Sequence, residues 1–156
     1  MDLISDGYKQ CLENKYEETL RPRALNWGAS GARYAGEWVV GIVEDYDIKT
    51  ALDYGCGKAT LSEHIGGVEW TNYDPGLQMY AEVPTGTYDL VVSSDVLEHI
   101  EPEYLDNVIQ HMGGLSGKIL AADIPTDPTG QLLAEGPYAG HDEHLTVENV
   151  DWWQQR

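Results

Sequence analysis

The fold is decided by the stretch Ala51-Leu52-Asp53-Tyr54-Gly55-Cys56-Gly57-Lys58, in which a short apolar run meets two closely spaced glycines. The run over residues 48–54 has the length and composition of a buried β-strand. Gly55 and Gly57 allow the backbone to turn tightly and to approach a ligand, because neither has a Cβ atom. Since many α/β proteins contain such a turn, the stretch alone predicts a strand-to-helix connection, with or without a ligand.

Helical and strand patterns alternate on both sides of this turn. We expect strands over 48–54, 68–73, 88–93 and 118–124, and helices within 3–12 and over 35–46, 59–65 and 103–112. Thr146 is expected to cap a last helix that holds Trp153. The alternation predicts one α/β domain over residues 1–156, with a Rossmann-like, mostly parallel sheet and helices on both faces. In such sheets ligands bind beyond the carboxyl ends of the strands.

Composition limits the possible partners. Hydrophobic residues make up 42% of the 156 positions and charged residues 23%, which is typical of a globular domain. Nine basic residues against 27 acidic ones give a net charge of −18, which repels phosphate backbones. A nucleic-acid partner is therefore disfavoured, although Arg21 and Arg23 could form a local basic patch. With neither a signal peptide nor a membrane-spanning run, we expect a cytoplasmic protein without a membrane partner.

Three further features indicate what the glycine turn binds. Thr60 stands where a dinucleotide fingerprint has its third glycine, which disfavours a pyrophosphate-containing cofactor. Asp53 lies two residues before Gly55, where it could act on a cationic amine or on the amides of the loop. Asp74 ends the next predicted strand, 19 residues after Gly55, where a carboxylate could accept both hydroxyls of a ribose. These features favour an adenosine-bearing cofactor.

Three motifs follow one another in the order expected of one family. The segments ALDYGCGK (51–58), YDP (73–75) and YDLVVSSDVLEHI (88–100) resemble those of class I S-adenosylmethionine-dependent methyltransferases. The similarity is greatest to small methyltransferase-like proteins of phages and bacteria, which share the WGxSG segment at 27–31, His144-Leu145 and the tryptophan pair at 152–153. The resemblance covers residues 27–153 and implies S-adenosylmethionine as the cofactor.

The resemblance also implies a set of cofactor-binding residues. Asp53 and the glycine turn would hold the methionine part and the ribose, Asp74 would bind the ribose diol, and Pro75 would lie beside the adenine. Residues 1–30 would form an N-terminal helix and a loop that covers the cofactor. The implied cofactor-binding residues are Trp27, Ser30, Asp53, Gly55, Cys56, Gly57, Asp74, Pro75, Ser93, Ser94, Asp95 and Val96.

The chain departs from the family pattern at several positions. Ala59 replaces a further glycine, and only fourteen residues separate Asp74 from Asp89, which leaves little room for a regular helix and another strand. The adenine side of the pocket is therefore expected to be abbreviated, with Glu82 as the only candidate for an acidic contact there. About thirty residues follow Ile124, too few for the usual antiparallel pair of strands. An uncovered strand edge would then predict a homo-oligomer.

Methyl transfer to a weak nucleophile requires positioning and a general base. His99 follows the predicted strand 88–93, and His144 lies in a glycine- and aspartate-rich loop, so both are candidate catalytic residues. Alternatively, His99 merely shapes the start of a helix. His141 and His144 with the acids between them could suggest a metal site, but three or four well-placed ligands are not evident. We therefore expect no metal.

The leading hypothesis is an S-adenosylmethionine-dependent methyltransferase that acts on an unknown small-molecule or protein acceptor. The segment after Val92 reads Ser-Ser-Asp-Val rather than the Asn/Asp-Pro-Pro-aromatic sequence of enzymes that methylate adenine in DNA. Two alternatives stay open: an S-adenosylmethionine-binding protein without catalysis, and an RNA methyltransferase. A nicotinamide-dependent oxidoreductase is a further alternative, against which the replaced third glycine argues.

Overall fold

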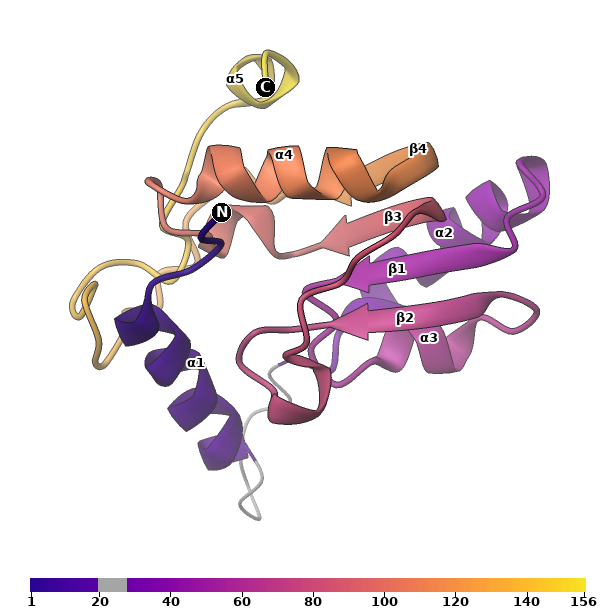
Figure 1. Cartoon of the computed structure of the whole chain (residues 1–156). Coiled ribbons are helices and arrows are strands. Elements are labelled where there is room, and N and C mark those ends of the chain that lie inside the picture. The colour runs from indigo at the N-terminus through magenta and orange to yellow at the C-terminus, as the bar shows by residue number, and fades with distance from the viewer. Residues whose placement is uncertain (20–27) are drawn as a thin grey trace.

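The computed structural model describes residues 1–19 and 28–156, so that Trp27, Arg21 and Arg23 lie outside the described residues. The centre of the described fold is a four-stranded sheet (Figure 1). Its strands are β1 (Thr50–Tyr54), β2 (Glu69–Tyr73), β3 (Tyr88–Ser94) and β4 (Ser116–Asp123). They are arranged in the order β2-β1-β3-β4, and every neighbouring pair is parallel.

Helices cover both faces of this sheet, as the sequence predicts. On one face α2 (Gly31–Asp45) and α3 (Thr60–His64) pack over Ala51, Leu90 and Val92. On the other face α4 (Leu105–Leu115) packs over Leu52 and Val91 (Figure 1). Successive strand residues point to opposite faces, so each face has its own buried apolar cluster. The predicted Rossmann-like α/β fold is confirmed.

The connections follow the sequence expectations with one correction. Between β2 and β3 the only regular element is the 3-10 helix η1 (Gln78–Tyr80), in agreement with the little room expected there. The last helix, α5 (Val150–Gln154), is capped by Asn149, whose Oδ1 accepts a hydrogen bond from the Trp152 amide at 3.0 Å. The prediction that Thr146 caps it was wrong, because the Thr146 amide instead donates to the carbonyl oxygen of Glu98, at 2.9 Å.

The N-terminal helix begins later and extends further than predicted. Ser5 precedes α1 (Asp6–Thr19), and its hydroxyl oxygen accepts a hydrogen bond from the Tyr8 amide at 3.1 Å, as a helix-capping serine does. The amide and hydroxyl of Ser5 also donate to the carboxylate of Glu101, at 2.8 and 2.7 Å. Glu101 therefore fixes the start of α1 against the segment that follows β3.

The outer strands of the sheet are β2 and β4. No described segment adds a strand beyond β4, in agreement with the expected lack of an antiparallel pair after the last parallel strand. The side chain of Leu120 on β4 is 42% exposed. The homo-oligomer predicted from an uncovered edge stays a prediction. Among the described helices, none combines the length and apolar character needed to span a membrane.

The interior of α2 offers a test of the helix packing. Gly41 lies within α2, and a Cβ atom built there would meet no other atom within 4 Å. Glycine destabilises a helix interior by about 0.8–1 kcal/mol relative to alanine. We expect Gly41→Ala to raise the free energy of unfolding by about 0.5–1 kcal/mol in urea denaturation.

Gly36 in the same helix provides the matched control, because its Cβ would lie 3.2 Å from the His64 ring. The gain in the free energy of unfolding should be smaller in Gly36→Ala than in Gly41→Ala, or absent, since the His64 side chain has to shift. An equal gain in both variants would contradict the described packing of α2 against α3.

Candidate functional site

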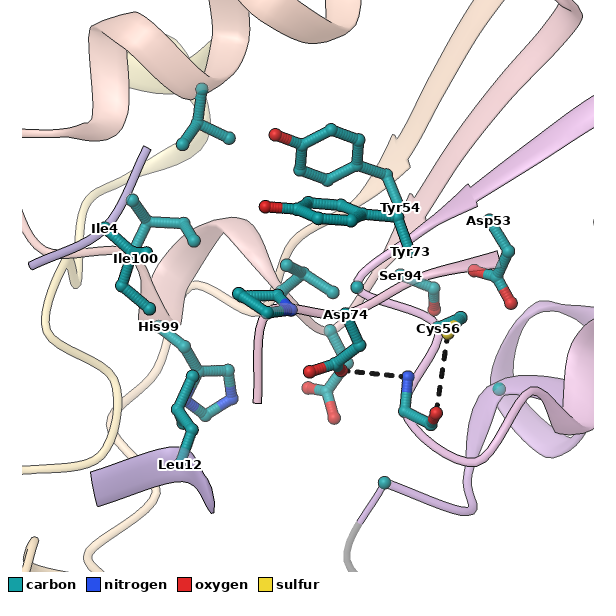
Figure 2. A pocket seen from close by; sticks show the side chains of 18 of the residues that line it. Ile4, Leu12, Asp53, Tyr54, Cys56, Tyr73, Asp74, Ser94, His99 and Ile100 are labelled. Carbon is teal, nitrogen blue, oxygen red and sulfur yellow. Dashed lines mark hydrogen bonds between the residues drawn. The ribbon is translucent and has the colours of Figure 1, made fainter. Parts of the chain in front are cut away.

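A pocket lies where the carboxyl ends of β1, β2 and β3 meet. Residues that follow these three strands line it together with the N-terminal segment, which includes Ile4, Tyr8, Leu12 and Tyr16. In Figure 1 the arrowheads of these strands point toward α1. Figure 2 shows Ile4 and Leu12 on one side of the pocket and Asp53 on the other. Its position matches the one expected for a ligand site in a parallel α/β sheet.

The glycine turn after β1 shapes the floor of this pocket. Gly55 and Gly57 have φ angles of 82° and 53°, in the left-handed region. A Cβ on Gly55 would lie 2.4 Å from Val96, and a Cβ on Gly57 would lie 2.3 Å from the carbonyl oxygen of Gly28. Both glycines are therefore required by close approach as well as by backbone conformation. Ala59 also has a positive φ, 58°, at the position where the family pattern has another glycine.

The carboxylate of Asp74 joins three parts of the site. Its Oδ2 accepts hydrogen bonds from the Gly57 amide at 3.0 Å and from the Tyr16 hydroxyl at 2.7 Å, and its Oδ1 accepts one from the Gly76 amide at 2.9 Å. Figure 2 marks the contact with Gly57. A carboxylate offers about four acceptor positions, so one remains, on Oδ1. A diol that donates to both oxygens would have to displace the Tyr16 hydroxyl.

Asp53 at the end of β1 is a second buried carboxyl group in the same pocket. Its exposed fraction is 5%, and burial raises its pKa to about 7, with a further increase from the negative charge of Asp74. Burial also raises the pKa of Asp74, although the hydrogen bonds from Tyr16, Gly76 and Gly57 oppose this shift. Two neighbouring buried carboxyl groups make the pocket favourable for a cationic ligand.

Most of the predicted cofactor-binding residues line this pocket. They are Ser30, Asp53, Gly55, Cys56, Gly57, Asp74, Pro75, Ser94, Asp95 and Val96. Ser93 is not among the residues that line it, and its predicted contact with the cofactor stays a prediction. Neighbouring residues of a strand point to opposite faces, and Ser93 is only 1% exposed within the sheet, whereas Ser94 reaches the pocket. Trp27, lying outside the described residues, keeps its predicted role as a prediction.

The two candidate catalytic histidines lie together beside the pocket. His99, on the 3-10 helix η2 (Leu97–His99), lines the pocket, and His144 lies against it with a distance of 4.8 Å between the ring centroids. Burial lowers the pKa of His99, which keeps its imidazole neutral. Glu98 lies beside both rings, fully buried, and burial raises its pKa to about 9. His141 is exposed and does not join this group.

Sequence reasoning missed the contribution of α1 to the pocket. Tyr8, Leu12 and Tyr16 lie at i, i+4 and i+8, a spacing that places them on one face of a helix, and all three line the pocket. This spacing could have been found, had the apolar pattern been followed beyond residue 12. Tyr54 and Tyr73 were missed as well; they end β1 and β2, and their rings pack edge to face with centroids 4.9 Å apart.

Comparison with known proteins agrees with this geometry. A family model described as "Methyltransferase domain" matches residues 18–155, nearly the whole chain. The chain belongs to this methyltransferase family. The resemblance to class I methyltransferases inferred from its motifs is thereby confirmed, whereas the closeness to phage proteins stays a prediction. No curated protein matches the sequence.

Among solved structures, the fold is similar to that of magnesium protoporphyrin IX methyltransferase (ChlM) from Synechocystis PCC 6803, determined with bound SAH. The TM-score is 0.50 and the sequence identity 18%, over 74% of this chain and 67% of that chain. At this identity the likeness concerns the fold. It places the described sheet and its helices among methyltransferase structures.

The raised pKa of Asp53 predicts how stability depends on pH. The folded chain binds the proton of Asp53 more tightly than the unfolded chain, because the pKa rises from 3.8 to about 7 on folding. This contribution to the free energy of unfolding is fully present below pH 3.8 and is lost as the pH rises through about 7. We therefore expect the unfolding free energy of the wild type to fall, relative to Asp53→Asn, between these pH values.

Denaturant unfolding at several pH values measures this difference, in which the titration of groups distant from Asp53 cancels. The titration of Asp74 also enters the difference, because its charge and that of Asp53 act on each other. Asp45→Asn, at an exposed position on α2, is the control and should show no such trend. If the difference between the wild type and Asp53→Asn is constant with pH, Asp53 does not carry the perturbed proton.

Proposed function

We propose that this protein transfers a methyl group from S-adenosylmethionine to a small-molecule or protein acceptor. The observation that carries the proposal is the pairing of Asp53 and Asp74 beside the glycine turn, at the carboxyl ends of adjacent parallel strands. Membership of the methyltransferase family supports the reaction class. The bound SAH in the similar ChlM structure supports the choice of cofactor.

Each part of the pocket suits one part of this cofactor. The ribose hydroxyls would donate to Asp74, which has one acceptor position left on Oδ1 and gains another when the Tyr16 hydroxyl moves away. Pro75, next to Asp74, would lie against the adenine. S-adenosylmethionine has a sulfonium and an ammonium group, so its net positive charge at neutral pH complements the two buried carboxyl groups.

The N-terminal helix would act as the cover of this site. Leu12 and Tyr16 of α1 line the side of the pocket that faces the strand ends, and Lys15 of α1 forms a 2.8 Å ion pair with Glu143. A covered pocket excludes water, which strengthens electrostatic interactions between the cofactor and the carboxylates. In this arrangement the Tyr16 side chain moves away from Asp74 when the cofactor enters, because Tyr16 and the ribose use the same carboxylate.

His99 and His144 are proposed to act on the acceptor side. His99 lines the pocket with a neutral imidazole, which is the form that a general base or a metal ligand requires. The net charge of −18 favours an acceptor other than a nucleic acid. Binding of the cofactor without turnover on any acceptor would instead indicate a binding protein that keeps only the pocket.

The carboxylate of Asp74 provides the direct test of the cofactor site. We expect Asp74→Ala to weaken the binding of S-adenosylmethionine at least tenfold in isothermal titration calorimetry, because charged hydrogen bonds contribute about 1.5–3 kcal/mol each. Asp74→Asn keeps the shape of the side chain and should also weaken binding. It thereby separates the loss of charge from a local collapse of the loop.

Asp89→Asn is the matched control. Asp89 is the second residue of β3, at the opposite end of the sheet, where it accepts a hydrogen bond from the Lys49 amide at 2.8 Å and pairs with Lys118 at 3.3 Å. Removal of the Asp89 charge in this variant should leave the affinity for S-adenosylmethionine unchanged. Absence of S-adenosylmethionine binding by the wild type, or full affinity in Asp74→Ala, would refute the proposed site.

A further inference from the structure

Four potential ligand side chains converge beside the cofactor pocket. Asp95, Glu98 and His99 come from the segment that follows β3, and His144 comes from the loop that precedes α5. One potential ligand atom from each residue lies within 4.8 Å of those of the others. Asp95 and His99 also line the pocket, so the cluster forms part of its wall.

Glu98 is the most unusual member of the cluster. Its side chain is fully buried, and neither carboxylate oxygen has a hydrogen-bond partner among the described residues. An unpaired buried polar group is costly, and a carboxylate is far more so, unless a partner compensates for the lost hydration. The side chains that face the Glu98 carboxyl are a second carboxyl group, that of Asp95, which opposes its ionisation, and the two imidazoles at 3.9 Å.

The two imidazoles are fixed in the orientation that metal ligands need. Nδ1 of His99 lies 2.8 Å from the carbonyl oxygen of Glu143, and Nδ1 of His144 lies 2.6 Å from that of Asp127. A carbonyl oxygen only accepts, so each Nδ1 carries a proton and donates it, and each Nε2 is the ring nitrogen that can bind a cation. Each Nε2 lies 3.9 Å from Oε1 of Glu98. Histidines that bind metals typically donate their other ring nitrogen to a carbonyl in this way.

We propose that Glu98, His99, His144 and Asp95 bind one divalent transition-metal cation, such as Zn²⁺ or Mn²⁺. In a tetrahedral site with bonds of about 2.1 Å, ligand atoms lie about 3.4 Å apart. The 3.9 Å separations therefore have to shorten by about 0.5 Å when an ion binds, and a pair at the widest separation, 4.8 Å, by about 1.4 Å. Two imidazoles with two carboxylates form a donor set suited to such cations. The two carboxylates balance the charge of the ion.

The proposed ion would give the histidines a role in the reaction of the proposed function, on which this part of the inference rests. Because Asp95 and His99 line the pocket, an open coordination position would face the space that the methyl acceptor has to enter. Of the segment from His141 to His144 that the sequence suggested as a metal cluster, only His144 belongs to this site. The Asp142 carboxylate instead accepts hydrogen bonds from the amides of Thr129 and Gly130, at 3.0 and 2.8 Å.

Metal titration of the full chain tests the inference. After removal of metal with a chelator, we expect calorimetry with ZnCl₂ and with MnCl₂ to show one site per chain for at least one of the ions. Glu98→Gln and His144→Ala should each weaken that binding at least tenfold. His141→Ala is the matched control, because His141 lies on the same loop but is exposed, and it should bind as the wild type does.

A second measurement needs no variant and so does not depend on whether the variants fold. Pulsed electron paramagnetic resonance of the Mn²⁺- or Cu²⁺-loaded wild type should detect the nitrogen nuclei of imidazole ligands. Absence of stoichiometric metal binding by the wild type, or absence of nitrogen couplings, would overturn the inference. So would a metal affinity of Glu98→Gln and His144→Ala equal to that of the wild type. In that case the cluster is a structural contact built around a protonated Glu98.

Cofactor binding is measured separately on metal-free and metal-loaded protein. Metal binding without S-adenosylmethionine binding would leave the ion site standing and refute the proposed function. Cofactor binding without metal binding would refute the ion site and leave the proposed function standing.

Discussion

The carboxylate of Asp74 is the interaction on which the pocket depends. It accepts hydrogen bonds from the glycine turn after β1, from the turn after β2 and from Tyr16 of α1, and so joins two strand ends to the helix that covers them. A buried carboxylate remains in place only because these donors replace its lost hydration. The same carboxylate is the proposed acceptor for the ribose diol. The fold without cofactor and the bound cofactor would therefore both form hydrogen bonds to Asp74.

Negative charge explains much of the rest of the site. Asp53, Asp74 and Glu98 are buried close to one pocket in a chain whose net charge is already −18. Burial raises the pKa of each of them, which means that the unliganded fold holds these carboxyl groups at a cost. Cationic ligands relieve that cost: a sulfonium cofactor at the glycine turn and, as we propose, a metal ion at the histidine pair. The two sites share a wall, and in both of them buried carboxyl groups favour a cationic ligand.

Local patterns made most of the fold predictable. Apolar residues at helical spacing identified α2 and α4, and apolar runs identified β1, β3 and β4. β1 and β3 are buried, whereas β4, at the edge of the sheet, has no buried residue. The cofactor residues were predictable where a short motif follows a strand, as at Asp53, Gly55 and Asp74. Ser93 and Ser94 are adjacent strand residues whose side chains point to opposite faces, and of the two only Ser94 lines the pocket. The motif alone does not tell which of two serines faces the pocket.

The sequence by itself determined the parallel α/β architecture, the glycine turn and the acid at the end of the next strand, since these depend on residues that are neighbours in the chain. Only the tertiary structure brought Tyr16 to Asp74, Ser5 to Glu101 and His144 to Glu98. These contacts join segments 46 to 96 residues apart, and no periodic pattern encodes such pairs. They form because folding places separate loops at the same edge of the sheet, where buried polar groups have to find partners.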